Sequence, residues 1–158
     1  MRRDFFLWTT LGGLFVLGTA LEGADLRVPS PYPTIQAAIT AAVNGDRVLV
    51  SQGTYPGAID FMGKAITVQS TDPTRPYVVE RTIIDANGAS SAVSLDSGET
   101  SAAKLDGFTI KDAVKGIYCN ASSPTVTRCV IAEVSTYGIY CSGGSPAISF
   151  CTVRGGTA

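Results

Sequence analysis

The sequence predicts an all-β solenoid, in which the chain winds into coils that stack along one axis. The first observation is an internal repeat: Gly-Ile-Tyr-Cys at 116–119 returns at 138–141, 22 residues later. The second is that each repeat carries short runs with the two-residue alternation of strands and no helical spacing. The third is that Gly, Pro, Asn, Asp and Ser separate these runs, as turns require. Such a period is typical of a solenoid with one coil per repeat.

Each repeat has inward and outward positions. Ile117 and Cys119 alternate with Tyr118, so we expect the first two inside the solenoid and Tyr118 outside. Parallel coils in register place equivalent side chains about 4.8 Å apart, which builds ladders along the core. The predicted structural core ladder comprises Phe108, Cys119, Cys129, Cys141 and Cys151.

A bend is predicted inside the second run of each repeat. Residues 126–131 place their apolar side chains inward only if Arg128 turns the chain. Phe150 holds the same position one repeat later. Gly107 holds it one repeat earlier, where a left-handed backbone costs glycine least.

One helix is predicted, from about Thr34 to Val43. Thr34 is a suitable N-cap, Asn44 and Gly45 form a typical stop signal, and the apolar residues between them fall on one stripe. Without a cover, the first coil of a solenoid exposes its core and unpaired strand edges. We therefore expect this helix to be the N-terminal cap.

The N-terminal half also resembles a known group of proteins. The segments Tyr-Pro-Thr-Ile-Gln-Ala-Ala-Ile (32–39), Gly-Asp-Arg-Val-Leu-Val (45–50), Gly-Thr-Tyr (53–55) and Gly-Lys-Ala-Ile-Thr-Val (63–68) are similar to the opening of secreted right-handed parallel β-helix proteins. That group, the pectin-lyase-like superfamily, includes polysaccharide-degrading enzymes and repeat proteins without an assigned activity. The resemblance covers roughly residues 26–158. It implies the right-handed fold, but not one activity, because the fold hosts many chemistries.

The first 20 residues have the pattern of a secretory signal peptide. Arg2 and Arg3 precede an apolar run that ends with small residues at Gly18 and Ala20. An uncleaved membrane anchor is the alternative, but the run is short for a span and is diluted by Thr and Gly. We predict export to a secreted, periplasmic or cell-surface location, with no stable membrane span after cleavage.

Residues 21–158 are expected to form one β-helix domain. The next repeat would begin at position 160, so the chain stops inside a repeat and the domain is predicted to be incomplete at its C-terminus. An open last coil is expected to attract another strand or chain, which makes self-association a candidate property.

Charge and cysteine usage exclude several classes. Removing residues 1–20 takes two Arg and one Asp from the 12 basic and 13 acidic residues and leaves a net charge of −2, without the basic patch of a nucleic-acid-binding protein. The four cysteines would stack on parallel strands with parallel side-chain vectors, a poor disulfide geometry, so we expect reduced thiols. No C-x-x-C spacing and no histidine support a zinc site, and no cofactor is predicted.

The sequence offers no recognisable catalytic constellation. The chain has no histidine, so hydrolysis would need two facing carboxylates. Asp85 and Asp96 lie in turn contexts, whereas Asp106 and Asp112 have no partner that the pattern identifies. A lyase would need acids beside a Lys or Arg base, and no convergent cluster is predicted among Lys104, Lys111, Lys115 and Arg128.

Two outward tyrosines are the candidate binding residues. Tyr118 and Tyr140 lie one repeat apart, so stacking would create a flat aromatic strip on which a sugar ring can lie. The alternative is that tyrosine simply suits an exposed strand position. We expect an exported module that binds an extended polysaccharide or acts as a scaffold. The second hypothesis is the N-terminal part of a polysaccharide lyase, glycoside hydrolase or pectinesterase.

Overall fold

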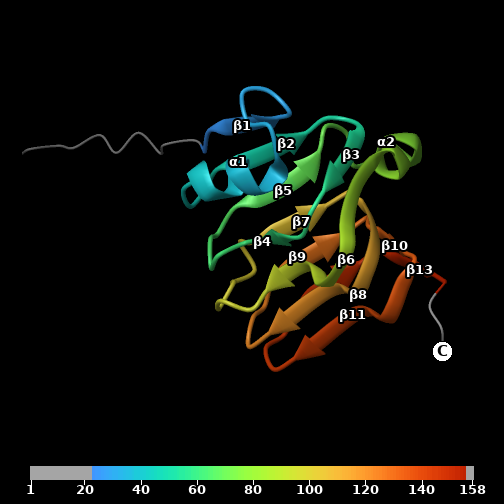
Figure 1. Ribbon diagram of the computed structural model, residues 1–158. Helices are drawn as coiled ribbons and strands as arrows, with labels where there is room; N and C mark the ends of the chain where they lie inside the picture. Colours follow the sequence, from blue (N-terminus) through green and yellow to red (C-terminus); the bar gives the residue numbers. More distant parts are fainter. Residues whose placement is uncertain (1–22, 156–158) are drawn as a thin grey trace, which may run out of the picture.

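The computed structural model describes residues 23–155, and within them the predicted fold class is confirmed. Parallel strands form two sheets that stack as a β-solenoid (Figure 1). The predicted signal peptide, residues 1–20, lies outside the described residues. Figure 1 shows α1 and β1 at one end of the solenoid and β11 at the other.

The first sheet forms one wall of the solenoid with one strand from each coil. Its strands pair in the order β1, β2, β5, β7, β9 and β12, all parallel. Their bounds are β1 Asp25–Val28, β2 Arg47–Val50, β5 Thr67–Ser70, β7 Lys104–Asp106, β9 Thr125–Thr127 and β12 Ala147–Ser149.

The second sheet forms the other two walls, because its long strands bend. The first halves of β6 and β8 pair with β3 and β10, and their second halves pair with β4 and β11. Strand β13 continues the sheet beyond β10. The bounds are β3 Gly53–Pro56, β4 Ile59–Asp60, β6 Thr82–Leu95, β8 Thr109–Asn120, β10 Val130–Ala132, β11 Val134–Ser142 and β13 Thr152–Arg154.

Residues with positive φ mark the corners between the walls. The predicted bend is confirmed: Gly107, Arg128 and Phe150 have φ of 76°, 51° and 54° in three successive coils. A second column of left-handed residues, Asp112 and Glu133, separates the two halves of the second sheet. The left-handed backbone turns the chain within one residue, so a coil of short strands can close on itself.

The interior is a set of apolar ladders, as predicted. Ile110 pairs with Ile131, which pairs with Val153, and Ile117 pairs with Ile139. In the structural core ladder, however, the burial is uneven. The members of the inner coils are fully buried, whereas Cys141 is exposed and Cys151 is partly buried. These two cysteines occupy inward positions of the last described coil, on which no further coil of the described residues is stacked. The buried part of the ladder is therefore Phe108, Cys119 and Cys129.

The N-terminal helix is confirmed as a cap, although it is shorter than predicted. Helix α1 spans Ile35–Ala41 and packs against β1, β2 and β4. Thr34 is the N-cap, and its hydroxyl accepts a hydrogen bond from the Ala37 amide at 3.1 Å. Ala42 turns into an extended conformation, so Val43 leaves the helix and is exposed rather than packed on the core.

A second helix was missed and explains the irregular period. Helix α2 spans Pro76–Arg81 and follows β5. Paired positions lie 22 residues apart from Thr125 to Ala147, but 37 apart from Thr67 to Lys104, because the coil that contains α2 is longer. The insertion leaves the stacking intact and lengthens only the connection between two walls.

Candidate functional site

Two tyrosines on the outer surface of β8 and β11 stack, as the 22-residue register predicted. Tyr118 and Tyr140 are paired positions, with ring centroids 5.7 Å apart and an angle of 22° between the ring planes. Atoms in van der Waals contact lie about 3.5–4 Å apart, so the rings are displaced sideways and do not form a face-to-face sandwich. The expected single flat strip is thus an offset stack, in which each ring is partly covered by the other.

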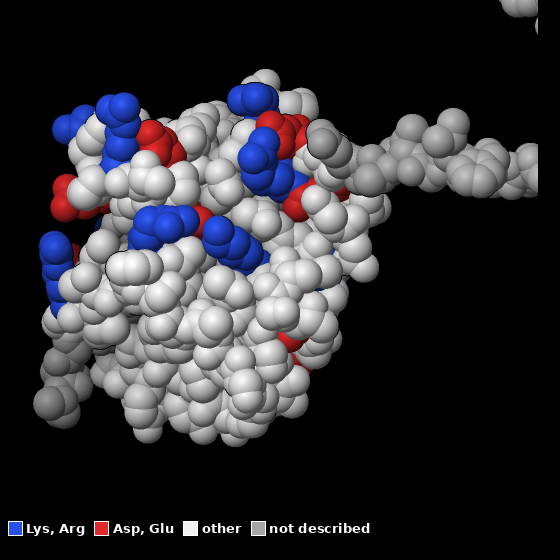
Figure 2. Space-filling view, turned by 180° about the vertical axis from the view of Figure 1, so that it is seen from behind, with Lys and Arg blue, Asp and Glu red and all other residues white. Residues whose placement is uncertain are grey.

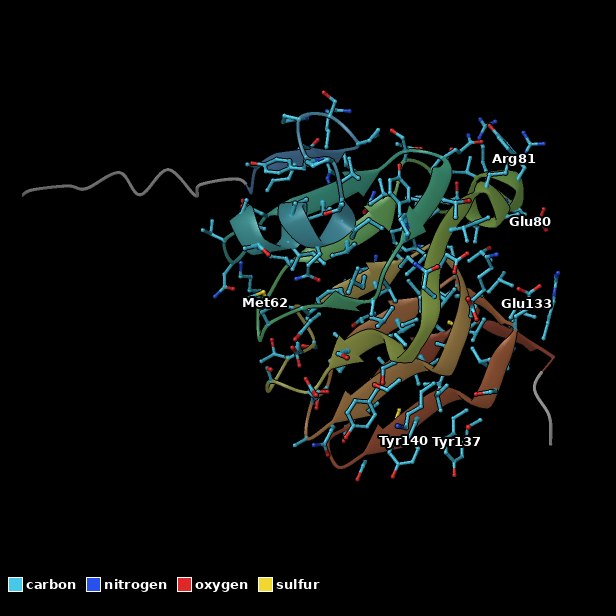
Figure 3. All side chains as sticks on the ribbon, viewed as in Figure 1. Met62, Glu80, Arg81, Glu133, Tyr137 and Tyr140 are labelled. Carbon is cyan, nitrogen blue, oxygen red and sulfur yellow. The ribbon has the colours of Figure 1, made fainter. Side chains whose placement is uncertain are left out.

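A third tyrosine and a lysine complete the group. Tyr137 packs against Tyr140 with centroids 5.2 Å apart and planes at 52°, and Lys115 Nζ lies 5.3 Å from the centroid of the Tyr118 ring. Tyr137 is 48% exposed, and Figure 3 shows Tyr137 and Tyr140 projecting side by side away from the solenoid. We call Tyr118, Tyr137, Tyr140 and Lys115 the tyrosine cluster.

An irregularity in the strand pairing brings Tyr137 into the cluster. The register between β11 and β8 shifts between Val134 and Tyr137, and the shift places Tyr137 opposite Lys115. The repeat pattern could not indicate this contact, because Tyr137 has a lysine at the matching position of the previous repeat. The signal available in the sequence was only the spacing of two tyrosines on either side of Gly138-Ile139.

The glycine of each Gly-Ile-Tyr-Cys repeat allows the adjacent coils to approach closely at this site. A Cβ on Gly116 would lie 2.5 Å from the carbonyl oxygen of Gly138, and a Cβ on Gly138 would lie 2.6 Å from a methyl group of Val153. Neither distance leaves room for a methyl group. The glycines therefore fix the position of the strand from which the tyrosines project.

Polar residues continue the outward rows across the neighbouring coils. Tyr140 and Tyr118 are followed in register by Ser94 and Asp60, and Lys115 is followed by Ser91. The wall thus changes from hydroxyl and carboxylate groups on the inner coils to aromatic rings on the last two. This arrangement combines hydrogen-bonding groups with a surface for stacking.

The four cysteines are free thiols in two stacked pairs, in agreement with the sequence analysis. Burial raises the pKa of the Cys119 thiol to about 12, and Cys141 is its register partner. In the second pair, a hydrogen bond from Cys129 lowers the pKa of the partly buried Cys151 to about 7, and the same interaction raises the pKa of Cys129. Cys151 is the thiol with the greater thiolate character.

A convergent cluster of one acid and two bases exists, contrary to the sequence prediction. Both carboxylate oxygens of Asp106 bind the guanidinium of Arg128, and Lys104 Nζ lies 3.0 Å from Asp106 Oδ2. The Asp106 side chain is 1% exposed, so the outward position is buried beneath its two partners. The pattern concealed this contact because Arg128 lies at a bend, where its direction does not follow strand alternation. A carboxylate saturated in this way has no free lone pairs with which to act as a base, so the cluster is structural.

The other three candidate carboxylates do not converge. Asp85 pairs with Lys111 at 3.1 Å and accepts a hydrogen bond from the Asn87 amide, and both interactions lower its pKa. The predicted turn at Asp85 is thus present within β6, where Asn87 has φ of 51°. Asp96 is exposed after β6, and Asp112 occupies a corner.

Figure 2 shows how charge is distributed on the face turned away from the viewer in Figure 1. Basic and acidic side chains gather towards the end from which the N-terminal segment leaves, and the opposite end carries few charges. Within residues 23–155, no group of three or more Cys, Asp or Glu side chains is arranged to hold a metal ion. In the same range, no helix has the length and apolar character needed to cross a membrane.

Comparison with known proteins adds no relative to these observations. No protein-family model, curated protein or solved structure matches this chain. The case for function therefore depends on the geometry described above.

Proposed function

We propose that this protein is an exported β-solenoid module that binds an extended polysaccharide on the tyrosine cluster. The observation that carries the proposal is the contact of three tyrosine rings on adjacent coils, with Tyr137 48% exposed and Lys115 beside them. Aromatic rings with an apolar face and a polar hydroxyl suit sugar rings, which stack on the face and hydrogen-bond at the edge.

The repeat geometry supports an extended ligand. Successive coils present equivalent outward positions about 4.8 Å apart, so a polymer that lies along the solenoid axis meets the same kind of group on each coil. Beyond the rings it would meet Ser94 and Asp60, which supply a hydroxyl and a carboxylate on the same wall. Stacking on the tyrosines would position the polymer, and the polar row would bind its hydroxyl groups.

The resemblance to pectin-lyase-like β-helix proteins supports the same class of ligand and an exported location. Binding is preferred over the enzymatic alternative, because the two acid-base contacts among the described residues are closed ion pairs. Asp106 is saturated by Arg128 and Lys104, and Asp85 is paired with Lys111. We therefore assign this segment a binding role.

Affinity electrophoresis tests the proposal directly. The protein would be run through gels that contain xylan, laminarin, hydroxyethyl cellulose or polygalacturonate. At least one polymer should retard the wild type, and a Tyr137→Ala/Tyr140→Ala double variant should lose most of the retardation. Tyr77→Ala is the matched control, because Tyr77 is an exposed tyrosine on α2, outside the cluster. Equal retardation of the wild type and the double variant would contradict the proposal.

A further inference from the structure

A second concave surface lies away from the tyrosine cluster, between α2 and the corner that contains Arg128 and Phe150. It has a volume of about 250 Å³. Figure 3 shows Glu80, on α2, at the opposite end of the view from Tyr137 and Tyr140. The cleft is therefore not part of the tyrosine cluster. Its wall and floor include Pro73, Pro76, Val79, Glu80, Arg128, Phe150 and Arg154.

The wall of the cleft is a rigid segment. Asp72 accepts hydrogen bonds from the amide and hydroxyl of Thr74 and pairs with Arg75 at 2.9 Å. Pro73 covers Gly107 so closely that a Cβ on this glycine would lie 2.4 Å from the proline Cβ. Thr109 Oγ1 donates to the Val79 carbonyl at 3.0 Å and fixes α2 to β8. The wall is thus formed before any ligand arrives.

The floor contains an aromatic ring in an unusual position. Phe150 is 84% exposed and has φ of 54°, a left-handed conformation that is rare for a bulky residue and unfavourable by about 1–3 kcal/mol. Neither burial nor the bend itself accounts for phenylalanine here, since glycine and arginine form the same bend in the two preceding coils. A large exposed ring beside a preformed wall is typical of a stacking surface for a ligand.

Hydrogen-bonding groups of both kinds surround this ring. Arg128 is held in place by Asp106, so its remaining donors are fixed at the side of the cleft. Arg154 supplies further donors, and Glu80 supplies acceptors from α2. A ligand with several adjacent hydroxyl groups can use donors and acceptors together, because each hydroxyl both donates and accepts.

We propose that this cleft is a carbohydrate subsite that holds one pyranose ring against Phe150, with Arg128, Arg154 and Glu80 binding its hydroxyl groups. The volume is below the roughly 300–1,000 Å³ of clefts that take drug-sized ligands, which limits the occupant to about one ring. The inference rests on the proposed function only for the class of ligand. It adds a site that recognises a single sugar residue or chain end to a wall that binds the extended polymer.

Amide chemical shifts measured by NMR test the proposal. The probes are the methyl glycosides of glucose, galactose, mannose and xylose and of glucuronic and galacturonic acid, each titrated to high millimolar concentration. At least one probe should shift the amides of Val79, Glu80 and Thr152, which border the cleft. Phe150→Ala should weaken that binding about tenfold, the loss expected for one stacked ring. Tyr77→Ala, a substitution on α2 outside the lining, should leave it unchanged.

The two proposals can fail separately. Tyr137→Ala/Tyr140→Ala should bind the glycoside as the wild type does, because the tyrosine cluster lies elsewhere. If no glycoside shifts the cleft amides, or if Phe150→Ala binds as tightly as the wild type, the cleft is not a sugar subsite, whatever the gels show. If a glycoside binds in the cleft but no polymer retards the protein, the polymer-binding proposal alone is overturned. Phe150 is largely exposed, so the variant should fold, and its circular dichroism spectrum checks this.

Discussion

The guanidinium of Arg128 binds both carboxylate oxygens of Asp106, one coil earlier, and thereby joins two coils at the corner of the solenoid. The carboxylate is 1% exposed, whereas Arg128 and Lys104 are 33% and 35% exposed. The acid is therefore buried and the bases keep part of their hydration. The same contact fixes one side of the proposed sugar subsite.

Asp106→Ala should destabilise the protein. A fully buried pair costs about 3–5 kcal/mol when one partner is removed, and partial exposure of the two bases reduces this to about 1–3 kcal/mol. The measurement is the free energy of unfolding in urea. Asp25→Ala is the control, since Asp25 pairs with Arg47 on the exposed surface and should cost less than about 1 kcal/mol. Equal losses in the two variants would show that the buried cluster has no special weight.

Gly116→Ala should destabilise the stacked coils, because its Cβ would lie 2.5 Å from the Gly138 carbonyl oxygen. Overpacking of this kind costs about 1–3 kcal/mol. Val114→Ala, at an exposed position on the same strand, should change the free energy of unfolding by less than about 0.5 kcal/mol. A melting profile of Gly116→Ala identical to that of the wild type would mean that the coils are not in this register.

Cys151 should be the thiol whose alkylation responds most steeply to pH near neutrality. Its pKa of about 7 means that the reactive thiolate forms as the pH rises through 7, whereas Cys119, with a pKa of about 12, stays protonated. Mass spectrometry after brief iodoacetamide treatment between about pH 6 and pH 8 measures both sites. Cys129→Ala removes the hydrogen-bond donor and should move the rise at Cys151 to higher pH. Alkylation of Cys151 that is flat over this range would refute the thiol pairing.

Lys64→Met should loosen the N-terminal cap. The Lys64 ammonium donates to the carbonyl oxygens of Ile39, Thr40 and Ala42 at 2.7, 2.8 and 2.9 Å, which satisfies the end of α1. Loss of these charge-assisted bonds should cost about 1.5–3 kcal/mol and accelerate amide hydrogen exchange in α1 first. Lys115→Met, which removes a lysine far from the cap, should leave exchange in α1 unchanged. Slow exchange retained in α1 of Lys64→Met would show that packing alone holds the helix.

The fold could be predicted because its information is local and repeated. The equivalence of Cys119 with Cys141 and the bend at Arg128 follow from alternation and a fixed period, and the structure confirms both. Helix α2 could not be predicted from the period, since an insertion between walls interrupts the repeat without disturbing the stack. The last coil departs from the expected burial because an inward position is buried only when another coil covers it.

The candidate sites were harder to predict because they depend on side-chain directions at irregular positions. The stacking of Tyr118 on Tyr140 follows from the register, but Tyr137 joins them only through a local shift in pairing. The contact of Arg128 with Asp106 starts from a left-handed residue, whose side chain leaves the strand pattern. Phe150 was identified as a bend residue, whereas its place in a cleft required knowledge of α2.

The most direct test of the account is an NMR titration of the wild type with oligosaccharides prepared from whichever polymer retards it in the gels. The account predicts amide shifts centred on residues 115–118 and 137–140, with smaller shifts at Ser91 and Ser94 along the same wall. Shifts confined to the first sheet, or no shifts in the presence of every oligosaccharide, would contradict the assignment of the tyrosine cluster as the polysaccharide-binding surface.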